Sequence, residues 1–121
     1  MAEQSDIVIY KICPRLEWEN AQSDGVFRGS AVDLVDGFIH FSAAHQVRET
    51  AAKHFRGQTD LLLIAFSAER LGQDLKWEAS RGGDLFPHLY AELKTDLALW
   101  QEALTLSADG APIIPERVPS C

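Results

Sequence analysis

The sequence predicts a small α+β domain. Of its 121 residues, 46% are hydrophobic and 24% are charged, which is typical of folded globular proteins. Several short apolar segments have the length and alternation of strands, and one longer segment repeats its apolar residues every four positions, as an amphipathic helix does. We therefore expect one domain over residues 1–121, with frayed tails at 1–6 and 116–121.

The chain should begin with a strand and a short helix. Residues 7–12 carry apolar side chains on both faces of an extended segment, which predicts a largely buried strand ended by Pro14. Residues 15–22 have apolar residues at helical spacing, and Ser23-Asp24-Gly25 supplies the stop signal.

The next segments should form a strand followed by a longer helix. Residues 26–35 show no clear period, so we interpret them as irregular, leading through the turn Asp36-Gly37 into a strand at 37–42. Over 43–55 the apolar residues recur every four positions, which predicts an amphipathic helix closed by Gly57.

The second half should return to strands. Residues 61–66 are apolar throughout and predict a buried strand, after which 67–71 form one helical turn. Residues 75–79 alternate apolar and polar side chains and predict another strand. Gly82-Gly83-Asp84 is expected to be a flexible loop, so a mobile flap is predicted beside the segment that follows it.

Two segments, 37–42 and 86–90, each place a histidine inside an apolar run. In an extended chain the side chains of His40 and Ser42 point to the same face. The same period aligns His88 with Tyr90, and Pro87 confines its segment to a sheet edge or a strand start. We therefore expect two imidazoles, a hydroxyl and a phenol to converge.

The order of short motifs resembles the small bacterial domain of unknown function 952 family. The motifs are IYKI, WENA, GFIHFS, QV, LLLI, KWE and FPHLY, and the resemblance spans roughly residues 7 to 94. GFIHFS followed by QV and FPHLY is the specific part, because strands such as IYKI and LLLI are common. The family is similar in fold to ADP-ribosyltransferases, especially the RNA 2'-phosphotransferases, in which a histidine-bearing strand contacts the nucleotide.

This resemblance implies an antiparallel split β-sheet with a few flanking helices, arranged as in ADP-ribosyltransferases. It also favours a strand over 98–106, although the apolar spacing of 95–106 fits a helix as well. Asp109-Gly110 is then a turn signal, and Ile113-Ile114 is expected to return as a partner strand.

The resemblance further implies a cleft for an NAD-like or ADP-ribose-like nucleotide. There His40, helped by Ser42, would hydrogen-bond a ribose hydroxyl or a phosphate oxygen. His88 would anchor the ligand or transfer a proton beside Tyr90 as a stacking wall, and Glu78 would stabilise a cationic sugar centre. The predicted catalytic residues are His40, His88 and Glu78; the predicted ligand-binding residues are Ser42, Tyr90, Lys11 and Arg28.

Each of these residues also has a purely structural interpretation. Backbone groups could satisfy His40 in a half-buried strand, Ser42 could cap the following helix, and Tyr90 could pack its ring in the core. Composition favours an exposed strand position for Glu78 and a solvated surface cation for Arg28.

The first strand departs from the family pattern at Lys11, where members often carry a histidine. A lysine binds phosphate as a point charge, but it cannot replace an imidazole that both donates and accepts hydrogen bonds. The departure makes a binding domain without catalysis the main alternative to a transferase.

Charge and composition argue against several classes of partner and site. The formal net charge of −7 disfavours nucleic acid, and no apolar stretch is long enough to span a membrane. The N-terminus lacks the features of a signal peptide, so a cytoplasmic location is expected. The two cysteines, Cys13 and Cys121, and the four histidines match no metal-binding spacing, so no metal site is predicted.

We therefore predict a small-molecule binding protein whose ligand is an NAD-like or ADP-ribose-like nucleotide, with glycosidic or phosphoryl transfer as its reaction class if it is an enzyme. The alternatives are a non-catalytic binding domain and a protein-interaction module that presents Trp18 or Trp100 to a partner.

Overall fold

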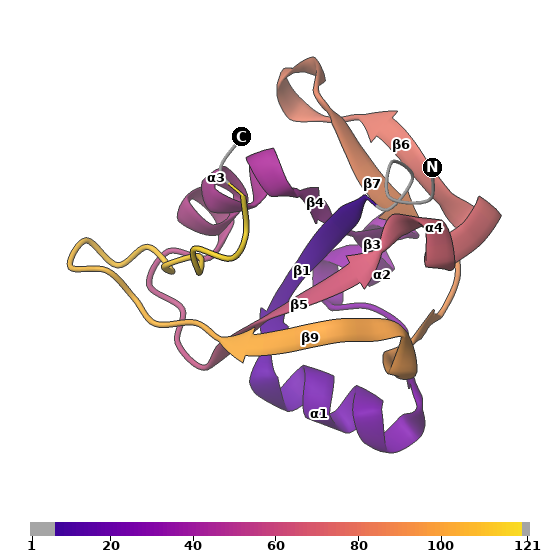
Figure 1. Ribbon diagram of the computed structural model, residues 1–121, viewed down its shortest axis with the longest axis horizontal. Helices are drawn as coiled ribbons and strands as arrows, with labels where there is room; N and C mark the ends of the chain where they lie inside the picture. The colour runs from indigo at the N-terminus through magenta and orange to yellow at the C-terminus, as the bar shows by residue number, and fades with distance from the viewer. Residues whose placement is uncertain (1–6, 120–121) are drawn as a thin grey trace.

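The computed structural model describes residues 7–119, apart from the side chain of Arg81. This part of the chain forms a mixed α/β domain in which every strand pairing is antiparallel, as expected (Figure 1). The strands are β1 (Val8–Pro14), β2 (Val26–Phe27), β3 (Ile39–His40), β4 (Ser42–Ala43), β5 (Leu61–Ser67), β6 (Leu75–Ala79), β7 (Leu85–Leu89), β8 (Leu93–Lys94) and β9 (Ala98–Ala103). The helices are α1 (Arg15–Asp24), α2 (Ala31–Asp36), α3 (Ala44–His54) and α4 (Ala68–Leu71), with short 3₁₀ turns at Gly72–Asp74, Arg81–Gly83 and Thr95–Leu97.

The central sheet has the strand order β4-β1-β5-β9. Strand β1 pairs with β5 over its whole length, from Val8 opposite Ser67 to Pro14 opposite Leu61. All seven residues of β5 are buried because both faces of the sheet are covered, which is why this strand is a continuous apolar run. The predicted strands at 7–12 and 61–66 are therefore confirmed.

Helices α1 and α3 cover different faces of the central sheet (Figure 1). On one face Trp18 of α1 is fully buried and contacts the rings of Phe27 and Phe66. On the other face Val47 and Ala51 of α3 are buried in a second core. Since Trp18 lies in the core, it is not available to a protein partner.

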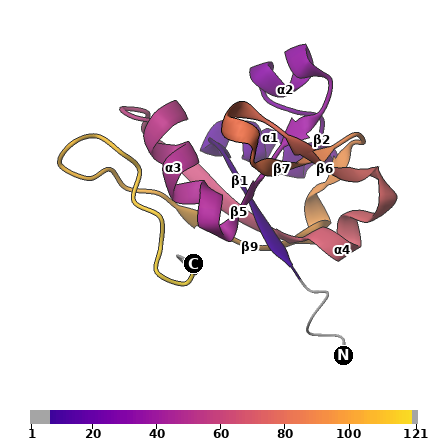
Figure 2. The same ribbon diagram turned by 90° about the horizontal axis from the view of Figure 1, so that it is seen from above.

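A second sheet, β3-β7-β6, packs on the α1 side of the central strands together with α2 (Figure 2). Residues 39–43 join the two sheets, because β3 pairs with β7 whereas β4 pairs with β1. Between them, the Phe41 amide donates a 3.0 Å hydrogen bond to the Pro87 carbonyl. The strand predicted over 37–42 is thus divided in two where the chain changes sheets.

Pro87 lies in β7, the middle strand of its sheet, and not at an edge as we expected. The position is tolerated because the regular pairing of β3 with β7 covers only Leu89 and His88 of β7 and does not include Pro87. A proline there removes no hydrogen bond from that ladder.

The interpretation of residues 26–35 as irregular is wrong, because they contain β2 and most of α2. Strand β2 pairs with β8, a strand that we did not predict. Both elements are too short to show a period: β2 has two residues and α2 has six.

The C-terminal region differs from expectation in its last elements. Strand β9 ends at Ala103, and Ile113-Ile114 forms no strand; an isolated bridge joins Leu106 to Pro112. The segment packs against α3 as far as Pro119, with Val118 buried and Arg48 donating a 2.8 Å hydrogen bond to the Val118 carbonyl. We had expected fraying from residue 116; positions 1–6 and 120–121 lie outside the described residues.

No helix within residues 7–119 combines the length and the hydrophobicity that crossing a membrane requires.

Candidate functional site

The two histidines of the sequence motifs face each other in the second sheet. His40 of β3 is paired directly with His88 of β7, and their ring centroids lie 5.5 Å apart. Phe38 stacks on the His88 ring at 4.1 Å and also contacts the rings of His40 and Tyr90, at 4.6 and 5.2 Å. Together with the carboxylates Asp33, Asp36 and Glu78 and the ammonium of Lys11, these four side chains form what we call the histidine cluster.

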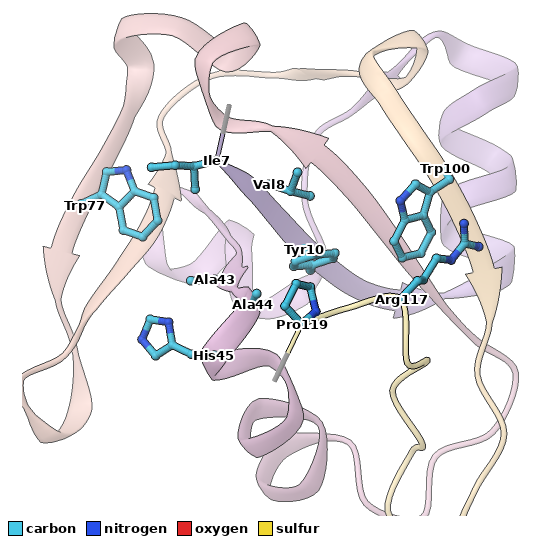
Figure 3. Close-up of a pocket in the computed structure, with 10 residues that line it drawn as sticks. All are labelled: Ile7, Val8, Tyr10, Ala43, Ala44, His45, Trp77, Trp100, Arg117 and Pro119. Carbon is cyan, nitrogen blue, oxygen red and sulfur yellow. The ribbon is translucent and has the colours of Figure 1, made fainter. Parts of the chain in front are cut away.

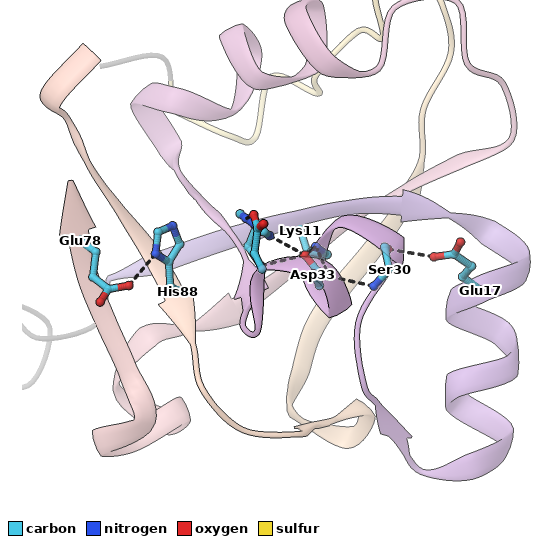
Figure 4. A network of polar contacts seen from close by, with 8 residues as sticks. Lys11, Glu17, Ser30, Asp33, Glu78 and His88 are labelled. Atoms are coloured by element: carbon cyan, nitrogen blue, oxygen red, sulfur yellow. Dashed lines mark hydrogen bonds and ion pairs between the residues drawn. The ribbon is translucent and has the colours of Figure 1, made fainter. Parts of the chain in front are cut away.

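Asp33 is the buried centre of this cluster (Figure 4). Its carboxylate lies 2.9 Å from Nζ of Lys11 and 2.6 Å from Nδ1 of His40, and it accepts hydrogen bonds from the Ser30 and His40 amides. Burial alone would raise the pKa of Asp33, but the hydrogen bond from His40 and the charge of Lys11 outweigh it and lower this pKa to about 2. Asp33 is therefore a carboxylate at neutral pH.

The local sequence explains how α2 places Asp33 beside His40. Ser30 stands at the helix N-cap, and Asp33, three residues later, accepts the Ser30 amide hydrogen bond at 2.8 Å. The Ser30 hydroxyl instead donates to Glu17 of α1 at 2.9 Å. Gly37 ends α2 with a φ of 89°, and the chain then turns into β3.

Glu78 holds the second histidine. Oε1 of Glu78 lies 2.8 Å from Nδ1 of His88 and accepts a 2.7 Å hydrogen bond from the Tyr90 hydroxyl. These two hydrogen bonds lower the pKa of Glu78, and the bond to Glu78 raises the pKa of Tyr90. Glu78 comes from β6 and the other two from the adjacent β7 segment, so strand pairing brings the three together.

Each imidazole thus meets a carboxylate through Nδ1, and because a carboxylate only accepts hydrogen bonds, Nδ1 is the donor in both contacts. Nε2 of His40 lies 2.9 Å from Asp36, a half-exposed residue. No residue between 7 and 119 hydrogen-bonds Nε2 of His88, so this nitrogen has no protein partner in the part of the chain that the structure describes.

The cluster is acidic. It contains three carboxylates, Asp33, Asp36 and Glu78, against the single ammonium of Lys11. Lys11 is 5% exposed and is held by Asp33. Such a site favours hydroxyl groups and positive charge over phosphate. Within the described residues, no group of three or more histidine, cysteine, aspartate or glutamate side chains is arranged to hold a metal ion.

The structure brings together five of the seven predicted site residues: His40, His88, Glu78, Tyr90 and Lys11. Ser42 lies apart; it is buried in β4 and donates to the hydroxyl of Thr50, and it is not the helix cap, because Ala43 takes that position. Arg28 is exposed and pairs with Asp24 and Glu92. It lines a small hollow beside α1 and not the histidine cluster.

Sequence reasoning missed three members of the cluster: Asp33, Asp36 and Phe38. The spacing of Ser30 and Asp33 matches a helix-capping signature and could have indicated α2. Phe38 lies two residues before His40, so the strand period that aligned His40 with Ser42 also placed Phe38 on that face.

Comparisons with known proteins agree with this architecture. The family model described as "Protein of unknown function (DUF952)" matches residues 12–101. The crystal structure of protein CC0527 from Caulobacter crescentus is 58% identical, with a TM-score of 0.86 over 88% of this chain and 93% of that one. The solution structure of CC0527 is 59% identical, with a TM-score of 0.79 over 87% of this chain and 90% of that one. A comparison with curated proteins finds no match.

Proposed function

The chain belongs to the DUF952 family of proteins of unknown function, and we propose that its histidine cluster binds a small NAD-like or ADP-ribose-like nucleotide. The observation that carries the proposal is the pairing of His40 with His88, each oriented by a carboxylate through Nδ1. Carboxylate-oriented imidazoles are suited to hold ribose hydroxyls and to move a proton near neutral pH.

The chemistry of the cluster fits the ribose and base of such a ligand better than its phosphates. Phe38 and Tyr90 offer aromatic faces, and Tyr90 is 45% exposed. Asp36 and Glu78 are half-exposed acceptors for sugar hydroxyls or for a positively charged pyridinium ring. Because Lys11 is already paired with Asp33, we place the phosphates outside the cluster.

The division into two sheets supports the proposed likeness to the ADP-ribosyltransferase fold. Residues 39–43 pass from one sheet to the other, and the histidine cluster lies beside this crossing. Fold likeness does not determine the reaction, which depends on the side chains of the site. The free thiol of Cys13 is compatible with the cytoplasmic location that we propose.

For an enzyme of this kind we propose glycosidic transfer. The bond between the ribose C1 atom and its leaving group would break, and Glu78 would face the positive charge that develops on the sugar. Nε2 of His88 would take the proton from the incoming hydroxyl, whose oxygen forms the new bond to C1. Phosphoryl transfer is less favoured because no free cation lies in the cluster.

A non-catalytic binding domain is the second candidate. Both nitrogens of His40 already have carboxylate partners, and Phe38 covers the His88 ring. A site in which His40 is held at both nitrogens and the His88 ring is covered can bind a ligand through hydrogen bonds without moving a proton.

Calorimetric titration with NAD and with ADP-ribose tests the binding, and His54→Ala is a matched control because His54 is an exposed histidine of α3. We expect binding by the wild type and by His54→Ala, and its loss in His40→Ala and His88→Ala variants that remain folded by circular dichroism. Binding that survives in both cluster variants would contradict the proposal. Release of nicotinamide from NAD, followed by chromatography, then separates a transferase from a binding domain.

A further inference from the structure

A cavity lies on the face of β1 and β6 opposite to the histidine cluster (Figure 3). It has a volume of about 620 Å³ and is lined by Ile7, Val8, Tyr10, Ala43, Ala44, His45, Trp77, Trp100, Arg117 and Pro119. Successive residues of a strand point to opposite faces. Tyr10 and Trp77 therefore enter this cavity, while their neighbours Lys11 and Glu78 belong to the histidine cluster.

Three of the ten residues that line this cavity carry large aromatic rings. Trp77 from β6, Trp100 from β9 and Tyr10 from β1 come from three strands, and the rings of Tyr10 and Trp100 lie 6.0 Å apart. The volume is in the usual range of small-molecule sites, about 300–1,000 Å³. These walls suit a flat aromatic ligand.

One charged side chain, Arg117, lines the cavity, and it is paired with Glu102. The chain has 18 acidic residues and a net charge of −7, yet none of the ten lining residues is acidic. The Arg117 guanidinium lies 3.6 Å from the Trp100 ring centroid and bonds Glu102 through Nε and Nη2. No described residue hydrogen-bonds Nη1 of Arg117, which leaves donor capacity for an anion.

Helix α3 begins at the wall of the cavity. Its N-cap is Ala43, whose amide donates a 2.9 Å hydrogen bond to Oε1 of Gln46. Ala43 has no side-chain oxygen of its own to accept from the amides that follow it in this 11-residue helix. The cavity is lined by Ala43, Ala44 and His45, the first residues of the helix. An uncapped helix N-terminus favours a negatively charged group.

The Tyr10 hydroxyl is an independent sign of a ligand. Tyr10 is only 4% exposed, and no residue between 7 and 119 hydrogen-bonds its hydroxyl. In this part of the chain, every fully buried side-chain nitrogen or oxygen has a hydrogen-bond partner. The hydroxyl of Tyr10 therefore retains access to the cavity that the residue lines, as a polar group available to a bound molecule.

We infer that this cavity binds a small aromatic carboxylate, with the ring against Tyr10 and Trp100 and the carboxylate near Arg117 and the start of α3. Tyr10 supplies a further hydrogen bond. The site does not depend on the nucleotide proposed for the histidine cluster, since the two sites use opposite faces of β1 and β6.

Indole-3-acetate is the probe for the test, with indole-3-ethanol as a neutral analogue of the same ring and acetate as the anion without a ring. Calorimetry should show binding of indole-3-acetate that exceeds both analogues at least tenfold. Arg117→Gln should weaken it about tenfold or more, because hydrogen bonds to charged groups contribute about 1.5–3 kcal/mol. Trp100→Ala should weaken it about three- to tenfold, and Tyr10→Phe, which keeps the buried ring, should weaken it several-fold.

Arg15→Gln is the matched control, because Arg15 is also a half-exposed, ion-paired arginine but lies away from the cavity. It should bind the probe as the wild type does. In ¹H–¹⁵N spectra the probe should shift the amide signals of Ala44 and His45. Equal affinity for indole-3-ethanol, absence of binding at millimolar probe, unchanged binding in both Arg117→Gln and Trp100→Ala, or shifts centred on His40 and His88 would each overturn the inference.

Discussion

Nζ of Lys11 lies 3.1 and 2.9 Å from the two carboxylate oxygens of Asp33, and the two side chains are only 6% and 1% exposed. Removing both charges from water is costly, and the pair persists because each side chain satisfies the other and Asp33 also accepts amide hydrogen bonds. The pair therefore fixes the place of His40 more than it adds net stability.

Lys11→Met should destabilise the protein strongly, because it removes the ammonium that faces the buried Asp33 carboxylate. We expect the free energy of unfolding to fall by about 3–5 kcal/mol. Lys53→Met is the matched control, since Lys53 pairs with Glu49 on the exposed face of α3, where such a pair contributes about 0.5 kcal/mol or less. Urea unfolding of both variants measures the difference, and equal losses would contradict the structural role of Lys11.

The low pKa of Asp33 predicts that the free energy of unfolding falls in acid, where this carboxylate becomes protonated. Its pKa is about 2 in the folded protein, below the ordinary value of 3.8, so the carboxylate stabilises the fold above pH 4 and the contribution is lost as the pH falls toward 2. The difference in unfolding free energy between the wild type and Asp33→Asn should therefore shrink by about 2 kcal/mol between pH 4 and pH 2. A constant difference over this range would contradict the prediction, and a ¹³C titration of the Asp33 carboxyl checks the pKa directly.

Sequence patterns predicted the parts of the fold that are long enough to show a period. The apolar run 61–66 and the four-residue repeat of 43–55 correspond to β5 and α3, whose ends differ from the predictions by only one residue. Strand alternation also placed His88 with Tyr90, and the structure joins both to Glu78. Local periodicity was sufficient here because neighbouring residues set the geometry.

The rest of the cluster depends on contacts that periodicity does not contain. Asp33 reaches His40 because α2, a six-residue helix, folds back on β3, and Lys11 meets Asp33 across 22 residues of chain. Ser42 was misplaced for the same reason: the strand changes sheets at Phe41, so Ser42 pairs with β1 while His40 pairs with β7.

The pKa of Tyr90 should report whether its hydroxyl is hydrogen-bonded to the Glu78 carboxylate. The hydrogen bond to the Glu78 carboxylate raises the pKa of Tyr90, so Glu78→Gln should lower this pKa toward 10. The chain has two tyrosines, Tyr10 and Tyr90, so ultraviolet titration in a Tyr10→Phe background follows Tyr90 alone. No change on Glu78→Gln would show that this hydrogen bond is not formed in solution.

Phe38 should shield His88 from reagents. The Phe38 ring stacks on His88 at 4.1 Å, and His88 is only 5% exposed. Phe38→Ala should therefore raise the rate of His88 modification by diethyl pyrocarbonate several-fold, measured by mass spectrometry. Phe55→Ala is the control, because Phe55 is partly buried in the core on the other face of the central sheet; an equal rise in both variants would indicate general loosening of the fold.

Gly29 should be required for the position of Asp33. It has a φ of +127°, and an added Cβ would lie 2.8 Å from Cβ of Asp33, a distance that forces α2 to move. Gly37, at the other end of α2, has a φ of +89° and no atom within 4 Å of an added Cβ. Both alanine variants carry backbone strain of about 1–3 kcal/mol, but only Gly29→Ala should also displace Asp33.

The two effects can be separated by measuring structure as well as stability. In Gly29→Ala the Nδ1 proton of His40, held by Asp33 at 2.6 Å, should lose its downfield NMR signal, whereas Gly37→Ala should keep it. Gly29→Ala should also unfold at a lower urea concentration than Gly37→Ala, because the steric clash adds to the strain that both share. If Gly29→Ala retained the His40 signal and matched Gly37→Ala in stability, the close approach of Gly29 to Asp33 would have no part in building the cluster.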